Sequence, residues 1–369
     1  MHIDLGGLKV GLVGPLPPPS GGMANQCQQL LDLFGQHGLK MELVRTNRPY
    51  PFSWVENLRG FRALFRLVPY LYSLWKLAGR SSVVHVLANS GWAWHLYAAP
   101  AIWLAKLRGT PVIVNYRGGE ADPFFSGAPR IVHRTLELAD SLVVPSGFLE
   151  KVFAKHGFTS RIVPNIINLD RFRARDPECL CNGSCHVVVT RNLEPIYGIP
   201  TVLEAFSRLK AALPTAKMTV AGSGPELVRL RALANDLGII DSVDFCGRID
   251  NVDIPKLYAS ADMMVNPSTV DNMPISVLEA FASGVPVVST SVGGVPFILR
   301  DGETGLLVSS GCVEEMAAAM IRIATDRGLA RRLASAAVDD VQRYSWARVR
   351  DLWLAEYVRV AKAKPMELS

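Results

Sequence analysis

Two carboxylates, Asp271 and Glu279, lie eight residues apart across the predicted start of a helix. Pro274 between them suits the first helical position, where a missing N–H costs nothing. The N–H groups of residues 275–277 have no acceptor inside such a helix, so they can hold an anion such as a diphosphate. Carboxylates instead accept hydrogen bonds from sugar hydroxyls. The pattern favours a sugar-phosphate site, although a capped helix with a solvated acid explains the same spacing.

A cation and a glycine pair could complete a phosphate site. Arg191 follows a predicted strand, where its guanidinium can grip a diphosphate with two parallel hydrogen bonds, and an interdomain salt bridge is the alternative. Gly21 and Gly22 precede the first predicted helix and let a phosphate approach the backbone. Their surroundings do not match G-x-G-x-x-G, so a dinucleotide site is not indicated, and a proline-rich surface turn is the alternative.

The first half of the chain offers candidates for binding a second substrate, the acceptor. Arg117 follows the strand predicted to start at Val112. It cannot serve as a base because it stays protonated, so its role would be electrostatic or acceptor-binding. His95 and Tyr116 are assigned to the same side. His85 is a further histidine of the first half, and lone histidines such as His85 and His95 are more often structural than catalytic.

Short β-branched runs alternate with helical patterns along the whole chain, which is typical of parallel sheets covered by helices on both faces. The predicted strands are 8–13, 40–44, 83–87, 112–115, 142–144, 185–190, 217–221, 242–245, 263–266, 285–289 and 305–308. The predicted helices include 24–34, 131–138, 201–212, 226–237 and 275–283. A polar, proline-containing segment follows residue 170 and marks a boundary. We expect domains at 1–165 and 166–344, with a terminal helix in 345–369 that packs back on the first domain.

The composition is that of a globular protein with a modest basic excess. The 369 residues include 49% hydrophobic and 20% charged residues, with a net charge of +6. Between Arg45 and Arg80 seven Lys/Arg face one acid, Glu56, and aromatic residues lie among them. Residues 57–80 could therefore lie on an anionic membrane, although Gly60 and Pro69 are expected to interrupt any single helix there. An ordinary core helix with snorkelling arginines is the alternative, and nucleic acid is not expected.

Two further patterns are weaker. Cys179, Cys181, Cys185 and His186 lie close together, but no second pair follows at zinc-site spacing, so no metal is expected. Residues 81–105 contain no charged Asp, Glu, Lys or Arg, yet polar residues divide them into a strand and a helix rather than a membrane span. The N-terminus lacks a signal peptide pattern, which favours a cytoplasmic location.

The segment 266–288 resembles the E-x₇-E motif of glycosyltransferase family 4, retaining enzymes of the GT-B fold, with Asp271 in place of the first Glu. The similarity covers nearly the whole chain and is weaker before residue 110. Other blocks resemble the family in order and spacing: 21–22, 222–225, 245–248, 261–268, 292–296 and 301–305. The resemblance implies two doubly wound Rossmann-like domains that face a central cleft.

The same resemblance implies roles for the donor-site residues. Glu279 would hold the ribose hydroxyls, Asp271 the transferred sugar, and Arg248 and Ile249 would border the base. Gly21 and Gly22 would meet the diphosphate. The remaining donor-binding positions would be Gly222, Gly224, Asn272, Met273, Pro274 and Ile275.

Two positions depart from the family pattern. Tyr197 stands where members usually have a Lys that pairs with Arg191, and Arg117 stands where many have a His beside the reaction centre. The expected activity is metal-independent transfer of a hexose-type sugar from a nucleotide diphosphate to a glycan or lipid-linked acceptor. It would take place in the cytoplasm or peripherally on the inner face of the plasma membrane. An epimerase, a phosphorylase or a non-catalytic scaffold of polysaccharide assembly are the alternatives.

Overall fold

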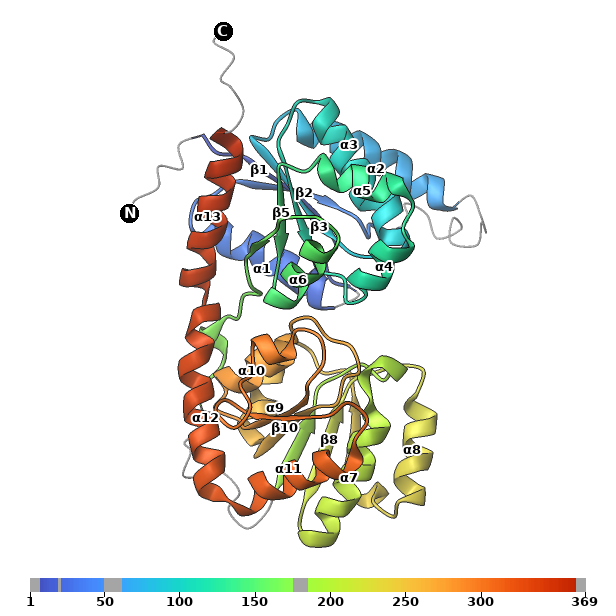
Figure 1. Ribbon diagram of the computed structural model, residues 1–369, viewed down its shortest axis with the longest axis vertical. Coiled ribbons are helices and arrows are strands. Elements are labelled where there is room, and N and C mark those ends of the chain that lie inside the picture. Colours follow the sequence, from blue (N-terminus) through green and yellow to red (C-terminus); the bar gives the residue numbers. More distant parts are fainter. Residues whose placement is uncertain (1–6, 19–20, 50–61, 175–184, 363–369) are drawn as a thin grey trace. The chain divides into compact units, whose positions relative to one another are not determined.

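Two α/β units, each with its own parallel sheet, make up the chain (Figure 1). A computed structural model describes residues 7–18, 21–49, 62–174 and 185–362, and the side chains of all of these except 62–64. Unit 1 comprises Met1–Ile166 together with Trp346–Ser369, and unit 2 comprises Ile167–Ser345. The last helix therefore belongs to the unit in which the chain begins.

Unit 1 has six parallel strands in the order β2-β1-β3-β4-β5-β6. They are β1 (Val10–Gly14), β2 (Met41–Arg45), β3 (Val83–Ala88), β4 (Val112–Tyr116), β5 (Ser141–Val144) and β6 (Arg161–Ile162). The direction of strand addition reverses between β1 and β3. Ligands of such sheets bind at the carboxyl ends of the strands at this switch point.

Helices cover both faces of the unit 1 sheet, because its central strands are apolar on both sides. One face carries α1 (Gly22–Gln36) and α13 (Trp346–Lys362). The other carries α2 (Arg62–Ala78), α3 (Ala99–Leu107), α4 (Ala121–Gly127), α5 (Arg130–Glu137) and α6 (Gly147–Lys155), with a π-helical turn at Trp94–Ala98. Successive residues of a strand point to opposite faces of the sheet. Leu12 therefore packs with α1 and α13, and its neighbour Val13 packs on the opposite face.

Unit 2 repeats this construction with the strand order β12-β11-β10-β7-β8-β9, again all parallel. The strands are β7 (His186–Val189), β8 (Lys217–Ala221), β9 (Val243–Gly247), β10 (Met263–Asn266), β11 (Val287–Thr290) and β12 (Leu306–Val308). Read from β9, this is the order of a dinucleotide-binding domain, and its switch point lies between β7 and β10.

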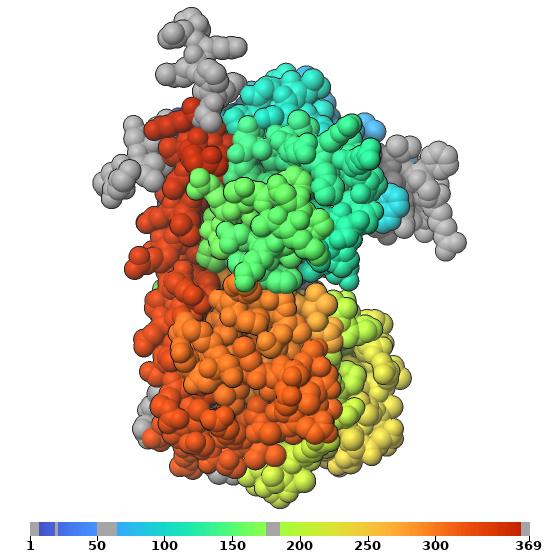
Figure 2. All heavy atoms as spheres, viewed as in Figure 1, coloured from blue at the N-terminus to red at the C-terminus, as the bar shows by residue number. Residues whose placement is uncertain are grey.

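The helices of unit 2 also lie on both faces of its sheet. One core contains α7 (Ile199–Ala212), α8 (Leu227–Asp236) and α11 (Val313–Thr325), and the other contains α9 (Ile254–Ser260) and α10 (Ile275–Ala282). The long helix α12 (Arg327–Val341) contributes to both cores. Short 3₁₀ turns lie at Leu169–Arg171, Pro195–Tyr197, Ile240–Ser242, Val295–Phe297 and Gln342–Tyr344. Figure 2 shows the same view with all heavy atoms drawn as spheres.

One local prediction is wrong, and one short strand was not predicted. Pro69 does not interrupt its helix, since α2 runs without a break from Arg62 to Ala78. The buried stripe of Tyr70, Leu74 and Leu77 holds this helix on the sheet, and such tertiary packing can outweigh the roughly 3 kcal/mol cost of an internal proline. Strand β6 has only two residues, too few for a sequence pattern, and was not predicted.

The uncharged stretch 81–105 forms strand β3, the π-helical turn and most of α3. None of the helices in the described parts of the chain is long and apolar enough to cross a membrane. The strand-and-helix interpretation of this stretch is therefore the correct one.

Candidate functional site

Arg191 lies at the switch point of the unit 2 sheet, just after β7. Its Nε donates to Oδ1 of Asn266, the last residue of β10, at 2.8 Å. Asn266 is fully buried and its amide nitrogen donates in turn to Ser289 Oγ at 2.9 Å. The ends of β7, β10 and β11 thus hold the guanidinium at the edge where ligands of such sheets bind.

Arg191 also forms an ion pair with Asp271, in the loop that follows β10. The two side chains are 12% and 13% exposed, so water screens them little. Burial raises the pKa of Asp271, while Arg191 and the N–H groups of Asn272 and Met273 act in the opposite direction. Arg191 and Asp271, predicted to bind different parts of a donor, are therefore bound to each other in this structure. The salt-bridge partner of Arg191 lies inside unit 2, whereas the alternative prediction was a salt bridge between the domains.

Glu279 lies on α10, one turn behind the helix start. Burial raises the pKa of its carboxyl group to about 7, opposed by the charges of Arg171 and Arg191 and by a hydrogen bond from Tyr258. The Tyr258 hydroxyl also contacts Thr190 Oγ1 at 2.8 Å and the Ser276 carbonyl at 3.0 Å. A carboxylate that is partly desolvated near two cations can accept hydrogen bonds from ligand hydroxyls.

The start of α10 differs in detail from the prediction. Pro274 is the cap, outside the helix, and Ile275 is the first helical residue. The N–H of Val277 donates to the Pro274 carbonyl at 3.2 Å, so the prediction that it is unpaired is wrong. The N–H groups of Ile275 and Ser276 precede this bond, at positions where a helix has no internal acceptor. An anion can therefore be met by two N–H groups of the helix, not three.

Three of the predicted donor-binding side chains are buried in unit 2: Asn272, Met273 and Pro274. Met273 belongs to the core around α10, which leaves it no surface for a ligand. These side chains hold the loop in place, so a donor would meet these three predicted positions through their backbone. A Cβ atom on Gly294 would overlap the Asn272 carbonyl, so a second loop packs directly on this one.

The predicted glycines of unit 2 also have a structural explanation. A Cβ atom on Gly222 would overlap the carbonyl of Arg191, and one on Gly224 would overlap that of Leu193. The loop after β8 is also tied to the loop after β7 by the bond from the Leu193 N–H to the Ser223 carbonyl, at 3.1 Å. These glycines let two backbones meet beside Arg191 and thereby position it.

Arg248 and Ile249 follow β9, the edge strand that lies two strands from β7. Gly247 before them has a φ of 73°, which suits a glycine at a sharp turn. The Arg248 side chain is exposed and that of Ile249 is half-buried. They occupy the same carboxyl edge of the sheet as Arg191, at its far end.

Tyr197 packs beside the arginine where a second cation was expected. Its ring centroid lies 5.5 Å from the Arg191 guanidinium carbon, in a 3₁₀ turn that Gly198 ends in a left-handed conformation. Burial raises the pKa of the Tyr197 hydroxyl, so this side chain is neutral at physiological pH. It can orient Arg191 through a cation–π contact but adds no charge.

In unit 1, Gly21 and Gly22 lie at the start of α1, on the carboxyl side of β1. Gly21 is the cap residue, and a Cβ atom there would meet nothing within 4 Å. Unlike Gly222, it has no packing partner that requires a glycine. Open space beside a helix start at the switch point is compatible with close approach of a phosphate.

The acceptor-side candidates have different surroundings. Arg117, half-buried at the end of β4, donates to Asn165 Oδ1, and burial lowers its pKa to about 10, so it keeps its charge. His95 is exposed, with its ring 6.3 Å from that of Trp92. Tyr116 is fully buried among Phe125 and Phe153, so its side chain is not exposed to an acceptor in this structure.

His85 is a structural residue. Its Nε2 accepts from Asn115 Nδ2 at 3.1 Å, so Nδ1 donates to the Tyr357 hydroxyl at 2.8 Å. Its ring also packs at 4.4 Å on that of Trp353 in α13. Burial lowers the pKa of His85 to about 3, so it is neutral and holds the C-terminal helix on unit 1.

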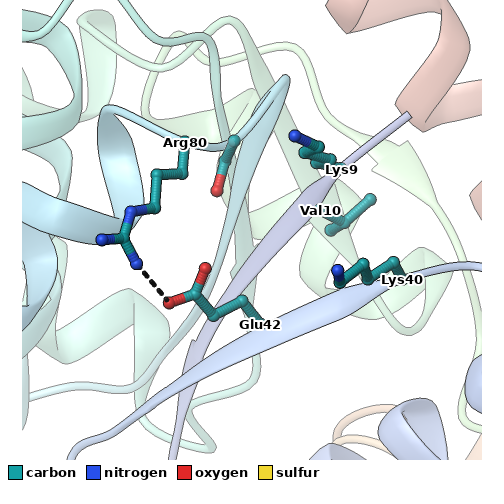
Figure 3. A pocket seen from close by; sticks show the side chains of 6 residues that line it. Lys9, Val10, Lys40, Glu42 and Arg80 are labelled. Carbon is teal, nitrogen blue, oxygen red and sulfur yellow. Dashed lines mark ion pairs between the residues drawn. The ribbon is translucent and has the colours of Figure 1, made fainter. Parts of the chain in front are cut away.

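Within the described residues no three His, Cys, Asp or Glu side chains are grouped for a metal ion. Cys179 and Cys181 lie outside the described residues. Cys185 is buried, and His186 contacts Thr219 Oγ1 at 2.8 Å. A hollow in unit 1 lies at the opposite, amino end of its strands (Figure 3). Lys9, Lys40 and Arg80 line it, and Arg80 lies 3.9 Å from Glu42. Because these residues lie at the amino ends of the strands, the hollow is separate from the predicted ligand edge.

The residues just described in unit 2 lie in a segment that known proteins share. Residues 182–340 match the family of glycosyl transferases group 1. The matched segment is somewhat under half of the chain, and it contains Arg191, Asp271 and Glu279. The glycosyl transferase match therefore covers most of unit 2 and leaves unit 1 outside.

Individual proteins resemble the chain over different lengths. A D-inositol 3-phosphate glycosyltransferase from Actinosynnema mirum is 39% identical over 246 residues, which cover 63% of this chain and 59% of that protein. The chain spans less than two thirds of the length of the curated relatives it matches, and only 23% of one of them.

Solved structures match nearly the whole chain. Sucrose-phosphate synthase from Thermosynechococcus elongatus has a TM-score of 0.77 at 20% identity, covering 96% of this chain and 100% of that one. Anabaena HepE in complex with UDP and glucose has a TM-score of 0.71 at 18% identity, covering 95% and 99%. The prediction of two Rossmann-like domains of the GT-B type is confirmed.

Two residues of this candidate site, Asn266 and Tyr258, were not predicted from the sequence. Asn266 anchors Arg191, and Tyr258 contacts the carboxylate of Glu279. A polar residue at the end of an otherwise apolar strand is a signal for Asn266. No local pattern distinguishes Tyr258 from a core tyrosine, because its role depends on a helix 18 residues away in the sequence.

Proposed function

We propose that this protein transfers a hexose-type sugar from a nucleotide diphosphate sugar to a glycan or lipid-linked acceptor, with retention at the anomeric carbon. One observation carries the proposal. Arg191, Asp271 and Glu279 come from three separate segments and meet at the switch point of unit 2, beside the start of α10. The glycosyl transferase match over these residues and the UDP bound to HepE support it.

The donor is held by charge and by backbone groups. In the proposal, Arg191 and the N–H groups of Ile275 and Ser276 bind the diphosphate, Glu279 accepts hydrogen bonds from the ribose, and Asp271 binds the transferred sugar. Arg248 and Ile249 border the base at the far end of the same edge. These groups neutralise the phosphates without a metal ion.

The ion pair between Arg191 and Asp271 makes donor binding an exchange. A diphosphate that approaches Arg191 competes with the Asp271 carboxylate, which is then available to the sugar hydroxyls. As the bond to the sugar breaks, negative charge grows on the departing diphosphate, and Arg191 with the helix start stabilises it. The acceptor hydroxyl attacks from the face that the diphosphate leaves, so no enzyme nucleophile is needed.

Unit 1 supplies the acceptor side in this proposal. Arg117 keeps its charge, and His95 is exposed near Trp92, so both suit a polar acceptor. Gly21 and Gly22 offer the diphosphate a second helix start. The D-inositol 3-phosphate glycosyltransferase relative suggests a polyhydroxylated acceptor. The free thiols of Cys27, Cys185, Cys246 and Cys312 fit a reducing cytoplasm.

Thermal-shift screening against UDP-, GDP- and ADP-sugars tests the donor site, because a ligand of the folded state raises the melting temperature. We expect one nucleotide to raise it and Glu279→Ala to abolish the rise. Asp236→Ala, which removes an exposed carboxylate on α8, is the matched control and should retain the rise. An unchanged rise in Glu279→Ala would contradict its role.

Incubation of the preferred donor with and without acceptor extract then distinguishes the activities. Sugar transfer that needs acceptor supports the proposal. Isomerised sugar nucleotide in the absence of acceptor indicates an epimerase. Binding without turnover in any extract indicates a non-catalytic scaffold. The scaffold alternative is considered because the residue beside Arg191 is the neutral Tyr197 and not a second cation.

A further inference from the structure

The helix α2 has an apolar stripe on its outer side as well as on its buried side. Tyr70, Leu74 and Leu77 face the sheet and are buried. The exposed large apolar side chains of this helix are Phe65 (39%), Val68 (62%), Tyr72 (60%) and Trp75 (40%). They follow one another at intervals of three and four residues, so they form a single line along the helix.

The neighbouring helix α3 extends this apolar surface. α3 packs beside α2 on the same face of the sheet, as Figure 1 shows. Its outward side chains are Trp103 (43% exposed) and Leu107 (73%), four residues apart. The Arg108 guanidinium carbon at the end of α3 lies 4.6 Å from the Trp75 ring centroid and links the two lines. We call these six apolar residues of the two helices the α2–α3 face.

The segment that carries the α2–α3 face is basic. Residues 62–108, which include α2 and α3, contain six Lys/Arg and no Asp or Glu. Lys76 Nζ lies 4.4 Å from the Tyr72 ring centroid, so two of the exposed rings carry a cation. Lys106 has an acidic partner in Asp140, and Arg80 has one in Glu42, both from other segments. Exposed aromatic rings that carry cations are complementary to a surface that is anionic outside and apolar inside.

We propose that the α2–α3 face docks on a bilayer with anionic headgroups. Exposed Trp and Tyr rings are stable at the boundary between headgroups and acyl chains, where one part of the ring is wet. Lys76 and Arg108 reach the lipid phosphates while their stems lie along the rings. A nucleic acid would require a polar basic stripe, and a second copy of the face would bring like charges together. An anionic bilayer offers acyl chains to the apolar side chains and phosphates to the cations.

Flotation of the full chain with vesicles tests the proposal. We expect binding to vesicles of phosphatidylcholine with phosphatidylglycerol, little binding to phosphatidylcholine alone, and release by added salt because screening weakens the headgroup contacts. Each charge reversal, Lys76→Glu or Arg108→Glu, should weaken binding by about fivefold or more. Lys151→Glu on α6 reverses an exposed cation of the same unit and should have no such effect.

Two matched variants test the contribution of the apolar side chains to vesicle binding. Val68→Ser on α2 and Val228→Ser on α8 both remove an exposed valine, 62% and 81% exposed. Only Val68→Ser, alone or with Tyr72→Ser, should reduce vesicle binding, and the melting temperatures should not change. Equal binding by all variants, or no binding by the wild type, overturns the proposal. So does a dimer in sedimentation that Val68→Ser abolishes, or binding to duplex DNA in place of vesicles.

The membrane proposal stands apart from the donor site. Glu279→Ala should bind vesicles as the wild type does, and Val68→Ser should retain the thermal shift with nucleotide sugar. Loss of vesicle binding in Glu279→Ala would contradict this separation.

Discussion

Arg191 binds Asp271 within unit 2 through Nη2, and Asn266 at the end of β10 accepts a hydrogen bond from Nε of the same guanidinium. Removal of one partner leaves the other charge poorly solvated. We expect Arg191→Ala or Asp271→Ala to lower the free energy of unfolding by about 2 kcal/mol or more. The double variant should lose less than the sum of the two. Urea denaturation of the four proteins gives the coupling energy, and simple additivity would show that the pair is not coupled.

Arg191→Ala should also reduce the rate of transfer. One electrostatic donor at a departing oxyanion typically contributes about 10²–10³-fold to kcat. Lys in place of Arg191 keeps the charge but loses the paired hydrogen bonds, so Arg191→Lys should be intermediate. Steady-state kinetics with the preferred donor measure both. An unchanged kcat in Arg191→Ala would exclude the arginine from stabilising the leaving group.

Glu279 should make the unliganded protein less stable as the pH rises. Its pKa is about 7 in the folded state against 4.5 in the unfolded state. Below pH 4.5 both states are protonated and nothing is lost. Between pH 4.5 and 7 the unfolded state releases its proton first, so stability falls, by roughly 3 kcal/mol in all. Glu279→Gln should remove this fall, which thermal melts from pH 4.5 to 8 can detect. Parallel curves for the two proteins would show an ordinary carboxyl pKa.

Tyr197→Lys should increase kcat. It places a second cation beside Arg191, where the structure has a neutral ring, and thereby stabilises the departing diphosphate by roughly tenfold in rate. Tyr197→Phe keeps the ring and should give no increase. A fall in kcat for the Lys variant would mean that the ring is needed to orient Arg191.

Two glycines should respond in opposite ways to alanine. Gly222→Ala forces the backbone apart at the Arg191 carbonyl and should destabilise unit 2 by about 2 kcal/mol. Gly21→Ala meets open space and should change stability by less than about 1 kcal/mol. If Gly21 meets the donor diphosphate, its variant should instead raise KM for the donor. Melting curves and kinetics on both variants separate a packing role from a ligand role.

Tyr357→Phe should loosen the C-terminal helix. It removes the acceptor of His85 Nδ1 inside a buried contact, at a cost of about 1–2 kcal/mol. Tyr72→Phe on the surface of α2 is the control and should have no effect. Because the pKa of His85 falls to about 3 on folding, wild-type stability should also decrease as the pH drops from about 6.5, where the unfolded chain takes up a proton. Urea denaturation at several pH values measures both effects.

The alternation of strands and helices was readable from the sequence because each element has its own local pattern. The buried runs of β3, β4, β10 and β11 are apolar on both faces, as parallel strands covered by helices must be. Local patterns also located the start of α10 within one residue. They failed at Pro69, where packing of α2 on the sheet overrides a local preference, and at β6, whose two residues carry no pattern.

Residue type and spacing also indicated Asp271, Glu279 and Arg191 as candidates near the carboxyl edge of a sheet, and the family resemblance suggested their roles. Strand order, ion pairing and burial could not be derived in that way, because they depend on segments distant in sequence. Arg191 meets Asp271 across 80 residues and His85 meets Tyr357 across 272. Residue identity and periodicity determined which elements form and which side chains are chemically able to act. Only the tertiary structure decided that Tyr116 and Met273 are enclosed in cores, that Gly222 serves a backbone contact, and that Arg191 is held by a carboxylate, because these outcomes depend on which neighbours the fold brings within reach.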